Sequence, residues 1–135
     1  MNSEEELSPD QITREELIDA KVLGNLKSLR NAQSASEPDI LVTLVDMFSQ
    51  DVPLRLSSLR EALDRGDMHQ TERISHSLKS SCASIGAKSM ADLCGFLENR
   101  ATQGISEGGH EIVDRIQTHF ALVAEILGAA RDSQV

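Results

Sequence analysis

Apolar residues recur at spacings of three and four along most of the chain, which is the pattern of helices that bury one face. The stripe is clearest near the C-terminus, in Ile112, Val113, Ile116, Phe120, Val123 and Leu127. The chain is short of the alternating β-branched and aromatic runs that favour strands. It has three Phe and no Trp or Tyr, so its core must be built from aliphatic residues. The pattern predicts an all-α fold.

The N-terminal part carries two competing signals for the start of a first helix. Thr13 and Glu16 have the spacing of a capping box, whereas Asp19 is suited to cap a shorter helix. In both cases the helix ends near Arg30. Residues 1–18 are mostly acidic and polar, so we expect a flexible leader that is helical only where the capping box acts.

The second predicted helix is long and contains a proline. Ser36 is a good N-cap, and Pro38 suits the first helical turn. An apolar stripe then continues as far as Gly66, which is a stop signal. Pro53 interrupts this stripe and removes a backbone donor. Residues 37–65 should therefore form either one kinked helix or two helices in series.

Three further helices follow with short connections. Their predicted ranges are 68–85, 88–101 and 110–130. The first of them is bracketed by Asp67 as a cap and Gly86 as a stop. Because the connections are short, neighbouring helices should run antiparallel. The expected domain is an antiparallel four-helix bundle with a short additional N-terminal helix, covering residues 19–131, with a tail at 132–135.

The helix over 68–85 has a polar face with a histidine at its centre. At about 100° per residue, the side opposite His76 is formed by Ile74, Leu78, Ser81 and Ile85, with Thr71 and Cys82 at its edges. The outward neighbours of His76 are His69, Glu72, Arg73, Lys79, Ser80 and Ala83. This pattern predicts that the imidazole is exposed.

An exposed imidazole of this kind can act as a nucleophile, because near neutral pH it is partly unprotonated. Lys79 lies one turn later and can bring positive charge to a phosphoryl group, and Arg73 can add more. Ser80 and Ala83 are small and leave room for another protein. On spacing alone, however, an exposed histidine is more often a solvated surface residue.

A metal site is not predicted on this face. His69 and His76 are about 10.5 Å apart along the helix axis, too far to share an ion directly, and a metal needs more ligands than the face offers. The two cysteines, Cys82 and Cys94, fall beside apolar residues, so we expect reduced thiols in the core.

The charge of the chain excludes some partners. A formal net charge of −9 argues against binding to nucleic acid and to anionic membranes. The acidic N-terminus lacks the positive region of a signal peptide, and no apolar run approaches the length of a membrane span. We expect a cytoplasmic monomer, because one bundle can satisfy all the apolar stripes.

Beyond these patterns, the sequence resembles the histidine-containing phosphotransfer (Hpt) domains of two-component phosphorelays. The resemblance is carried by His76-Ser77-Leu78-Lys79-Ser80-Ser81, by Ile85-Gly86-Ala87 and by Leu93-Cys94 with Leu97-Glu98. Upstream, Met47-Phe48, Pro53, Leu59-Arg60-Glu61-Ala62-Leu63 and Gly66-Asp67 also match. The match covers about residues 19–125. One position departs from the family, which usually has glycine where Ser80 stands.

The resemblance implies that His76 is the phosphorylated residue and that Lys79 stabilises the phosphoryl group. Such domains have no kinase activity of their own and bind no cofactor stably. The receiver domain of the partner supplies the aspartate and Mg²⁺. His76 would take the group from a phospho-aspartate and pass it to another receiver. Two alternatives are a module that docks receivers without phosphotransfer and a purely structural bundle, in neither of which His76 and Lys79 have a use.

Overall fold

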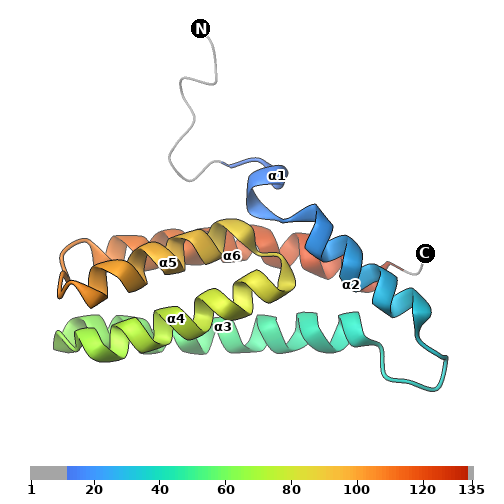
Figure 1. The fold of residues 1–135 in the computed structure, drawn as a ribbon, viewed down its shortest axis with the longest axis horizontal. Coiled ribbons are helices and arrows are strands. Elements are labelled where there is room, and N and C mark those ends of the chain that lie inside the picture. The colour runs from blue at the N-terminus through green and yellow to red at the C-terminus, as the bar shows by residue number, and fades with distance from the viewer. Residues whose placement is uncertain (1–11, 134–135) are drawn as a thin grey trace, which may run out of the picture.

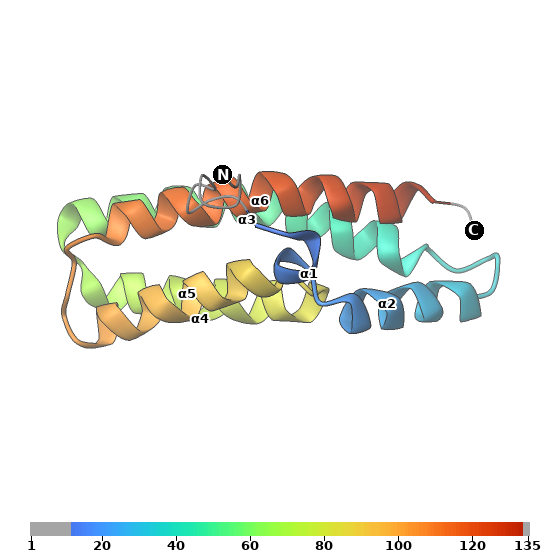
Figure 2. The same ribbon diagram turned by 90° about the horizontal axis from the view of Figure 1, so that it is seen from above.

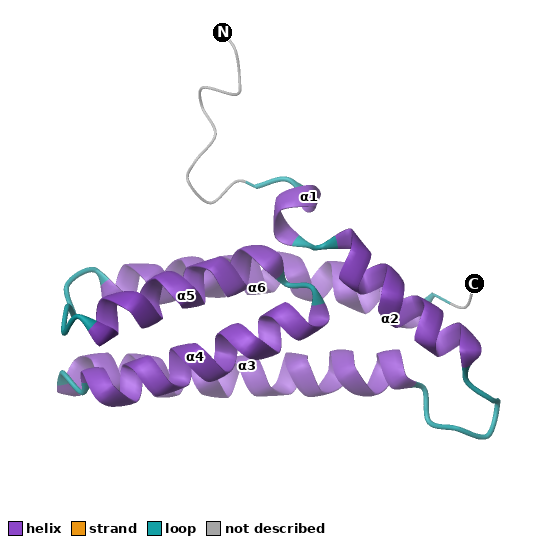
Figure 3. Ribbon diagram, in the orientation of Figure 1, coloured by secondary structure: helices purple, strands orange, loops and turns teal. Residues whose placement is uncertain are grey.

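The fold of residues 12–133 is entirely helical in the computed structural model, with no named strand among these residues (Figure 3). The six helices are α1 (Arg14–Leu17), α2 (Ala20–Ala32), α3 (Ile40–Arg65), α4 (Met68–Ile85), α5 (Lys88–Thr102) and α6 (Gly109–Asp132). The predicted all-α class is confirmed.

Helices α3 to α6 form an antiparallel four-helix bundle, as predicted (Figure 1). Seen from above, α4 and α5 make one layer and α3 and α6 the other (Figure 2). The interface between α4 and α5 is the most extensive in the bundle. The largest fully buried side chains are aliphatic, among them Leu41, Leu59, Leu78, Met90, Leu97, Ile116 and Leu127.

The N-terminal part uses both start signals, so there are two short helices where one was expected. Thr13 and Glu16 form the capping box of α1, and the carboxylate of Asp19 accepts hydrogen bonds from the first backbone amides of α2. The chain breaks between these helices because Ile18 forms an isolated antiparallel bridge with Ala87. A tertiary contact therefore decides what the local signals left open.

The predicted leader is wrong for residues 12–18, which belong to the bundle. Leu17 and Ile18 are only 4% and 3% exposed and are part of the core, and Ile12 packs against it. Residues 1–11 of that leader and residues 134–135 of the predicted tail lie outside the described residues.

Helix α3 begins at Ile40, later than predicted. Asp39, and not Ser36, is its N-cap, because the Asp39 carboxylate accepts hydrogen bonds from the amides of the first turn. The helix then runs through Pro53 to Arg65 without ending, so the alternative of two helices in series is wrong. Proline removes a single backbone donor, and Val52 beside it is fully buried, which holds this turn in the bundle.

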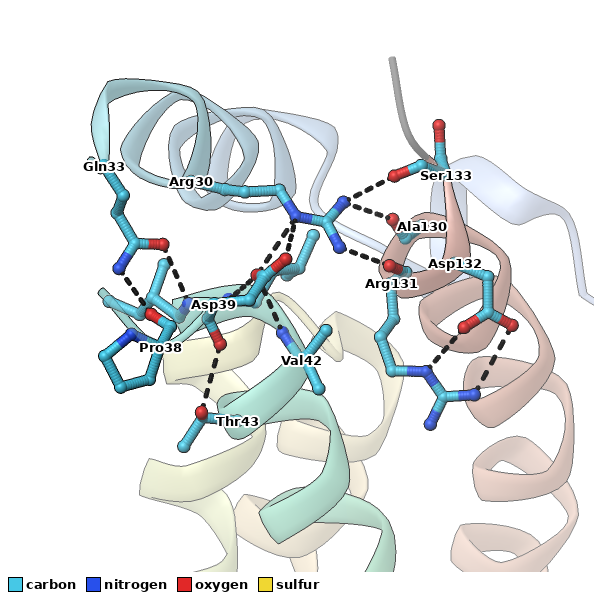
Figure 4. A network of polar contacts seen from close by, with 12 residues as sticks. Arg30, Gln33, Pro38, Asp39, Val42, Thr43, Ala130, Arg131, Asp132 and Ser133 are labelled. Carbon is cyan, nitrogen blue, oxygen red and sulfur yellow. Dashed lines mark hydrogen bonds and ion pairs between the residues drawn. The ribbon is translucent and has the colours of Figure 1, made fainter. Parts of the chain in front are cut away.

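Arg30 in α2 joins three helices at the end of the bundle where α6 ends (Figure 4). Its Nε lies 2.8 Å from the Asp39 carboxylate at the start of α3. Its guanidinium also donates to the carbonyl oxygens of Ala130, Arg131 and Ser133 at the end of α6. Those carbonyls have no partner within their own helix, so the arginine both caps α6 and fixes α2 to it.

Helix α4 has the predicted bounds. Asp67 caps its start by accepting a hydrogen bond from the Gln70 amide. Gly86 ends it with φ of 87°, a left-handed conformation that favours glycine. His76 therefore lies in the middle of a helix whose two ends are both fixed.

Candidate functional site

His76 projects from α4 with 61% of its side chain exposed, which confirms the predicted exposure. The buried face of α4 differs from the prediction, however. It consists of Thr71, Ser75, Leu78, Cys82 and Ile85, whereas Ile74 and Ser81 are only partly buried. This face is turned so that His76 lies about 40° from the centre of the outward side. Its contact with Glu98 shows that the imidazole lies on the side of α4 that faces α5.

A carboxylate from α5 holds the imidazole. His76 Nδ1 lies 2.8 Å from Glu98 Oε2, and Lys79 Nζ lies 2.8 Å from Glu98 Oε1. The Glu98 side chain is only 17% exposed. The hydrogen bond from Lys79, and to a smaller extent that from His76, lowers the pKa of the Glu98 carboxyl against the opposing effect of burial. Glu98 is therefore ionised at neutral pH.

The hydrogen bond to Glu98 determines which ring nitrogen can react. An ionised carboxylate has no proton to donate and only accepts, so Nδ1 must carry a hydrogen. In the neutral ring, Nε2 then has the free electron pair. With most of the side chain open to solvent, the arrangement presents a nucleophilic nitrogen of fixed tautomer.

The other three histidines of the chain have different surroundings. His119 is 4% exposed, and its Nδ1 lies 2.9 Å from Ser89 Oγ. His110 uses Nε2 to contact Asp64 at 2.9 Å. His69 is exposed on α4, about 10.5 Å before His76 along the helix axis. Of these four histidines, His76 is the one that is both exposed and in contact with a carboxylate through Nδ1.

The remaining predicted site residues lie along α4 around His76. Arg73, Ser80, Ala83 and His69 are exposed, and Glu72 is half-buried. Ser80 keeps its backbone carbonyl engaged, because Ser84 Oγ donates to it at 2.9 Å. Within residues 12–133, no three His, Cys, Asp or Glu side chains are grouped so that they could hold a metal ion.

On the other side of α4, a polar contact fixes α3 beside the histidine. Arg55 donates to the hydroxyl of Ser77, the residue that follows His76, and its Nε lies 2.6 Å from Asp51. This face of α4 is thus bordered on one side by Glu98 of α5, which pairs with Lys79 of α4, and on the other by the Arg55–Asp51 pair of α3.

An apolar groove of about 590 Å³ runs along α3 and α4 from this point. It is lined by Leu44, Met47, Asp51 and Leu54 of α3 and by Ser81 and Ser84 of α4, among others. Met47 and Leu54 are 62% and 69% exposed. Arg55, which contacts Ser77, also lines the groove. The groove therefore begins on the α3 side of α4, level with the residue that follows His76.

The two cysteines lie in the core, as predicted. Cys82 of α4 and Cys94 of α5 are free thiols with no exposed surface. A hydrogen bond with Cys82, together with burial, raises the pKa of the Cys94 thiol, which keeps it protonated.

Comparison with known proteins agrees with this geometry. The model of the Hpt domain matches residues 43–131. The chain belongs to the Hpt domain family. It is 28% identical to histidine-containing phosphotransfer protein 1 of Arabidopsis thaliana, over 81% of this chain and 70% of that protein. It is 25% identical to pseudo histidine-containing phosphotransfer protein 1 of Oryza sativa subsp. japonica, over 73% of this chain and 54% of that protein.

The Hpt fold is also that of a solved bacterial structure. Histidine-containing phosphotransfer protein B of Pseudomonas aeruginosa PAO1 superposes with a TM-score of 0.77 and 28% identity, covering 88% of this chain and 96% of that one. The chain is therefore a histidine phosphotransfer protein of two-component phosphorelays, and a docking module without phosphotransfer is not favoured.

Glu98 is the site residue that sequence reasoning missed. Its place in the Hpt-like string is readable from the sequence, but its contact with His76 is not. In the Hpt fold it lies 22 positions after His76 and meets it only because α4 and α5 pack side by side. No helical spacing links the two residues, so the α4–α5 hairpin had to be known first.

Proposed function

We propose that His76 accepts a phosphoryl group from the phospho-aspartate of one receiver domain and passes it to the aspartate of another. The observation that carries this proposal is the exposed imidazole whose Nδ1 is held 2.8 Å from the ionised Glu98. It supplies a nucleophile that is accessible to a second protein and already has the reactive tautomer.

The step follows from the position of the ring protons. Nε2 of His76 donates its electron pair to phosphorus while the bond from phosphorus to the aspartate oxygen breaks, and that carboxylate leaves with its electron pair. Throughout the transfer, Nδ1 keeps its hydrogen and donates it in the hydrogen bond to Glu98. The ring therefore becomes a phosphorylated imidazolium, and no base is needed. Transfer onward reverses these events, and the leaving group is then the neutral imidazole.

Lys79 supports the phosphoryl group in this proposal. It lies one turn after His76 on the same face of α4, and its side chain is 40% exposed, so its ammonium group can reach from Glu98 to a phosphoryl oxygen. A charge-assisted hydrogen bond to such an oxygen is among the stronger kinds. Arg73, exposed one turn before His76, adds positive charge on the approach side.

The receiver would complete the reaction centre. We expect the partner to bring the aspartate and the Mg²⁺ that neutralises charge on the transferred group, and this chain to bind no cofactor stably and to have no kinase activity of its own. We place the protein in the cytoplasm as a monomer. Within residues 12–133, no helix is long and apolar enough to cross a membrane.

The groove between α3 and α4 is the surface on which we expect the receiver to dock. It begins at Arg55, which contacts Ser77, and offers two apolar side chains, Met47 and Leu54, that are largely exposed. Interfaces depend on apolar anchors of this kind surrounded by polar residues, and Asp51 with Arg55 supplies the polar border. Ser80 and Ala83, which are small, leave the space between the groove and the imidazole open.

The proposal is tested by direct transfer. A receiver domain is phosphorylated with acetyl phosphate, freed of excess donor and mixed with this chain. We expect label on the chain that is labile in acid and stable in alkali, as for a phosphoramidate. A folded chain that takes up no label from any of a panel of receivers would reject the proposal.

A further inference from the structure

Glu98 contacts His76 and Lys79 at the same time, and once His76 is phosphorylated both contacts affect the stability of the phosphohistidine. In the resting site, Oε2 accepts a hydrogen bond from the imidazole and Oε1 forms an ion pair with the Lys79 ammonium, each at 2.8 Å. Oε1 is fully buried within the site. The carboxylate is therefore shared between the ring that reacts and the cation expected to bind the product.

We propose that Glu98 makes the phosphohistidine of this domain short-lived, so that the protein passes its phosphoryl group on and does not store it. This inference rests on the function proposed above. It assigns to Glu98 a role after phosphorylation, separate from setting the tautomer of the resting ring.

The first reason is the proton on Nδ1. If Nδ1 of the phosphorylated ring is protonated, attack on phosphorus by water or by an aspartate expels a neutral imidazole. The bond from nitrogen to phosphorus breaks, its electron pair returns to Nε2, and Nδ1 keeps its proton. If Nδ1 is unprotonated, the leaving group is an imidazolate, which is far poorer. An opposite charge at hydrogen-bond distance favours the protonated ring by about tenfold or more, and Glu98 provides that charge.

The second reason is competition for Lys79. A phosphoryl group on Nε2 brings two negative charges to within one ring width of Glu98. The two anions repel each other, and both attract the same ammonium group. As long as Glu98 holds the Lys79 ammonium at 2.8 Å, the ion pair between Lys79 and the phosphoryl group is weakened. Both effects shorten the lifetime of phosphohistidine.

Other charged groups around the ring do not supply the same effect. On α4, Glu72 and Arg73 lie one turn before His76 and Lys79 one turn after it. From α3, Arg55 and Asp51 pair with each other, and Arg55 contacts Ser77. From α5, the thiol of Cys94 is buried and protonated. Glu98 is the carboxylate in contact with Nδ1.

The test compares the lifetime of phosphohistidine in variants that share the same label. The purified full chain is phosphorylated with phosphoramidate, the reagent is removed, and the loss of the phosphohistidine signal is followed by phosphorus NMR from mildly acidic to mildly alkaline pH. Glu98→Gln keeps a hydrogen-bond acceptor but removes the charge. We expect it to lengthen the lifetime of phosphohistidine about tenfold at neutral pH, and to lower by about one unit the pH below which phosphohistidine is lost quickly.

Two further variants separate this role from a structural one. Lys79→Ala should shorten the lifetime, opposite in sign to Glu98→Gln, whereas damage to packing would move both in the same direction. Asp114→Asn removes a carboxylate that pairs with Arg60 on the α3–α6 side and should leave the lifetime unchanged. A Glu98→Gln lifetime equal to or shorter than that of the wild type would overturn the inference.

Outcomes for the two proposals are distinguishable. Absence of any phosphohistidine in the wild type would reject the proposed function, whereas normal labelling with an unchanged lifetime in Glu98→Gln rejects only the role of Glu98. If that variant loses its helical circular dichroism, nitrogen NMR of the phosphorylated wild type decides the matter. We expect Nδ1 to be protonated at neutral pH, and an unprotonated Nδ1 there would overturn the inference.

Discussion

Leu54 offers a direct test of the docking groove, because its side chain is exposed in the free protein. Leu54 is 69% exposed, so most of its apolar surface remains to be buried by a partner. Full burial of a leucine side chain is worth about 1.5–3 kcal/mol, and two thirds of that is about 1–2 kcal/mol. Leu54→Ala should therefore raise the Kd for a receiver domain by about 5- to 30-fold.

The measurement is calorimetric titration of the chain with a receiver that accepts phosphate from it, with both proteins unphosphorylated. Phe96→Ala is the matched control: Phe96 is another apolar side chain, 54% exposed, but it lies on α5 outside the groove. Leu54→Ala should unfold in urea within about 0.5 kcal/mol of the wild type, since exposed substitutions rarely cost more. Phe96→Ala should lose about 0.5–1 kcal/mol, because the Phe96 ring also stacks against the Arg100 guanidinium. An unchanged Kd for Leu54→Ala, or an equal loss for Phe96→Ala, would refute the assignment of the groove.

Three further predictions concern the stability of the scaffold and are checked by urea unfolding. Arg30→Ala should cost about 2–3 kcal/mol, because it leaves the carbonyls at the end of α6 without their charged donor; an effect below about 0.5 kcal/mol would contradict this. Gly86→Ala should cost about 1–2 kcal/mol, because φ is 87° and a Cβ would lie 3.2 Å from the carbonyl oxygen of Asp19; a neutral change would show that this turn relaxes freely. The pKa of Glu98 is lowered from its usual 4.5, so the stability from its contacts is complete above pH 4.5 and is lost as the pH falls through the lower pKa of the folded state. Glu98→Gln should therefore lower the free energy of unfolding at neutral pH but not in strong acid. A difference in the free energy of unfolding between variant and wild type that stays constant across this range would contradict the ion-pair interpretation.

The helix that carries the site was predictable from local signals, and its surroundings were not. Asp67 and Gly86 define the ends of α4 through a cap and a left-handed turn, and both are readable from the sequence. The buried face of α4 differs from the predicted one because the helix has few apolar residues. Ser75, which is polar, is fully buried in the structure, and a pattern of apolar positions alone cannot place it there.

Longer-range contacts account for the remaining differences. The break between α1 and α2 follows from the pairing of Ile18 with Ala87, and the later start of α3 follows from Asp39, which caps the helix and binds Arg30. Glu98 likewise reaches His76 across the α4–α5 interface. The pairs Ile18–Ala87 and His76–Glu98 join residues that are distant in sequence. Arg30 and Asp39 are nine positions apart on either side of a link between helices. Helical periodicity contains no trace of these contacts.

The central claim is that His76, and no other histidine of the chain, receives the phosphoryl group. The most direct measurement compares His76→Gln with His69→Gln, the other exposed histidine on α4, in the transfer assay from a phosphorylated receiver. We expect His76→Gln to take up no acid-labile label, whereas His69→Gln should be labelled as the wild type is. Equal labelling of a folded His76→Gln variant would contradict it.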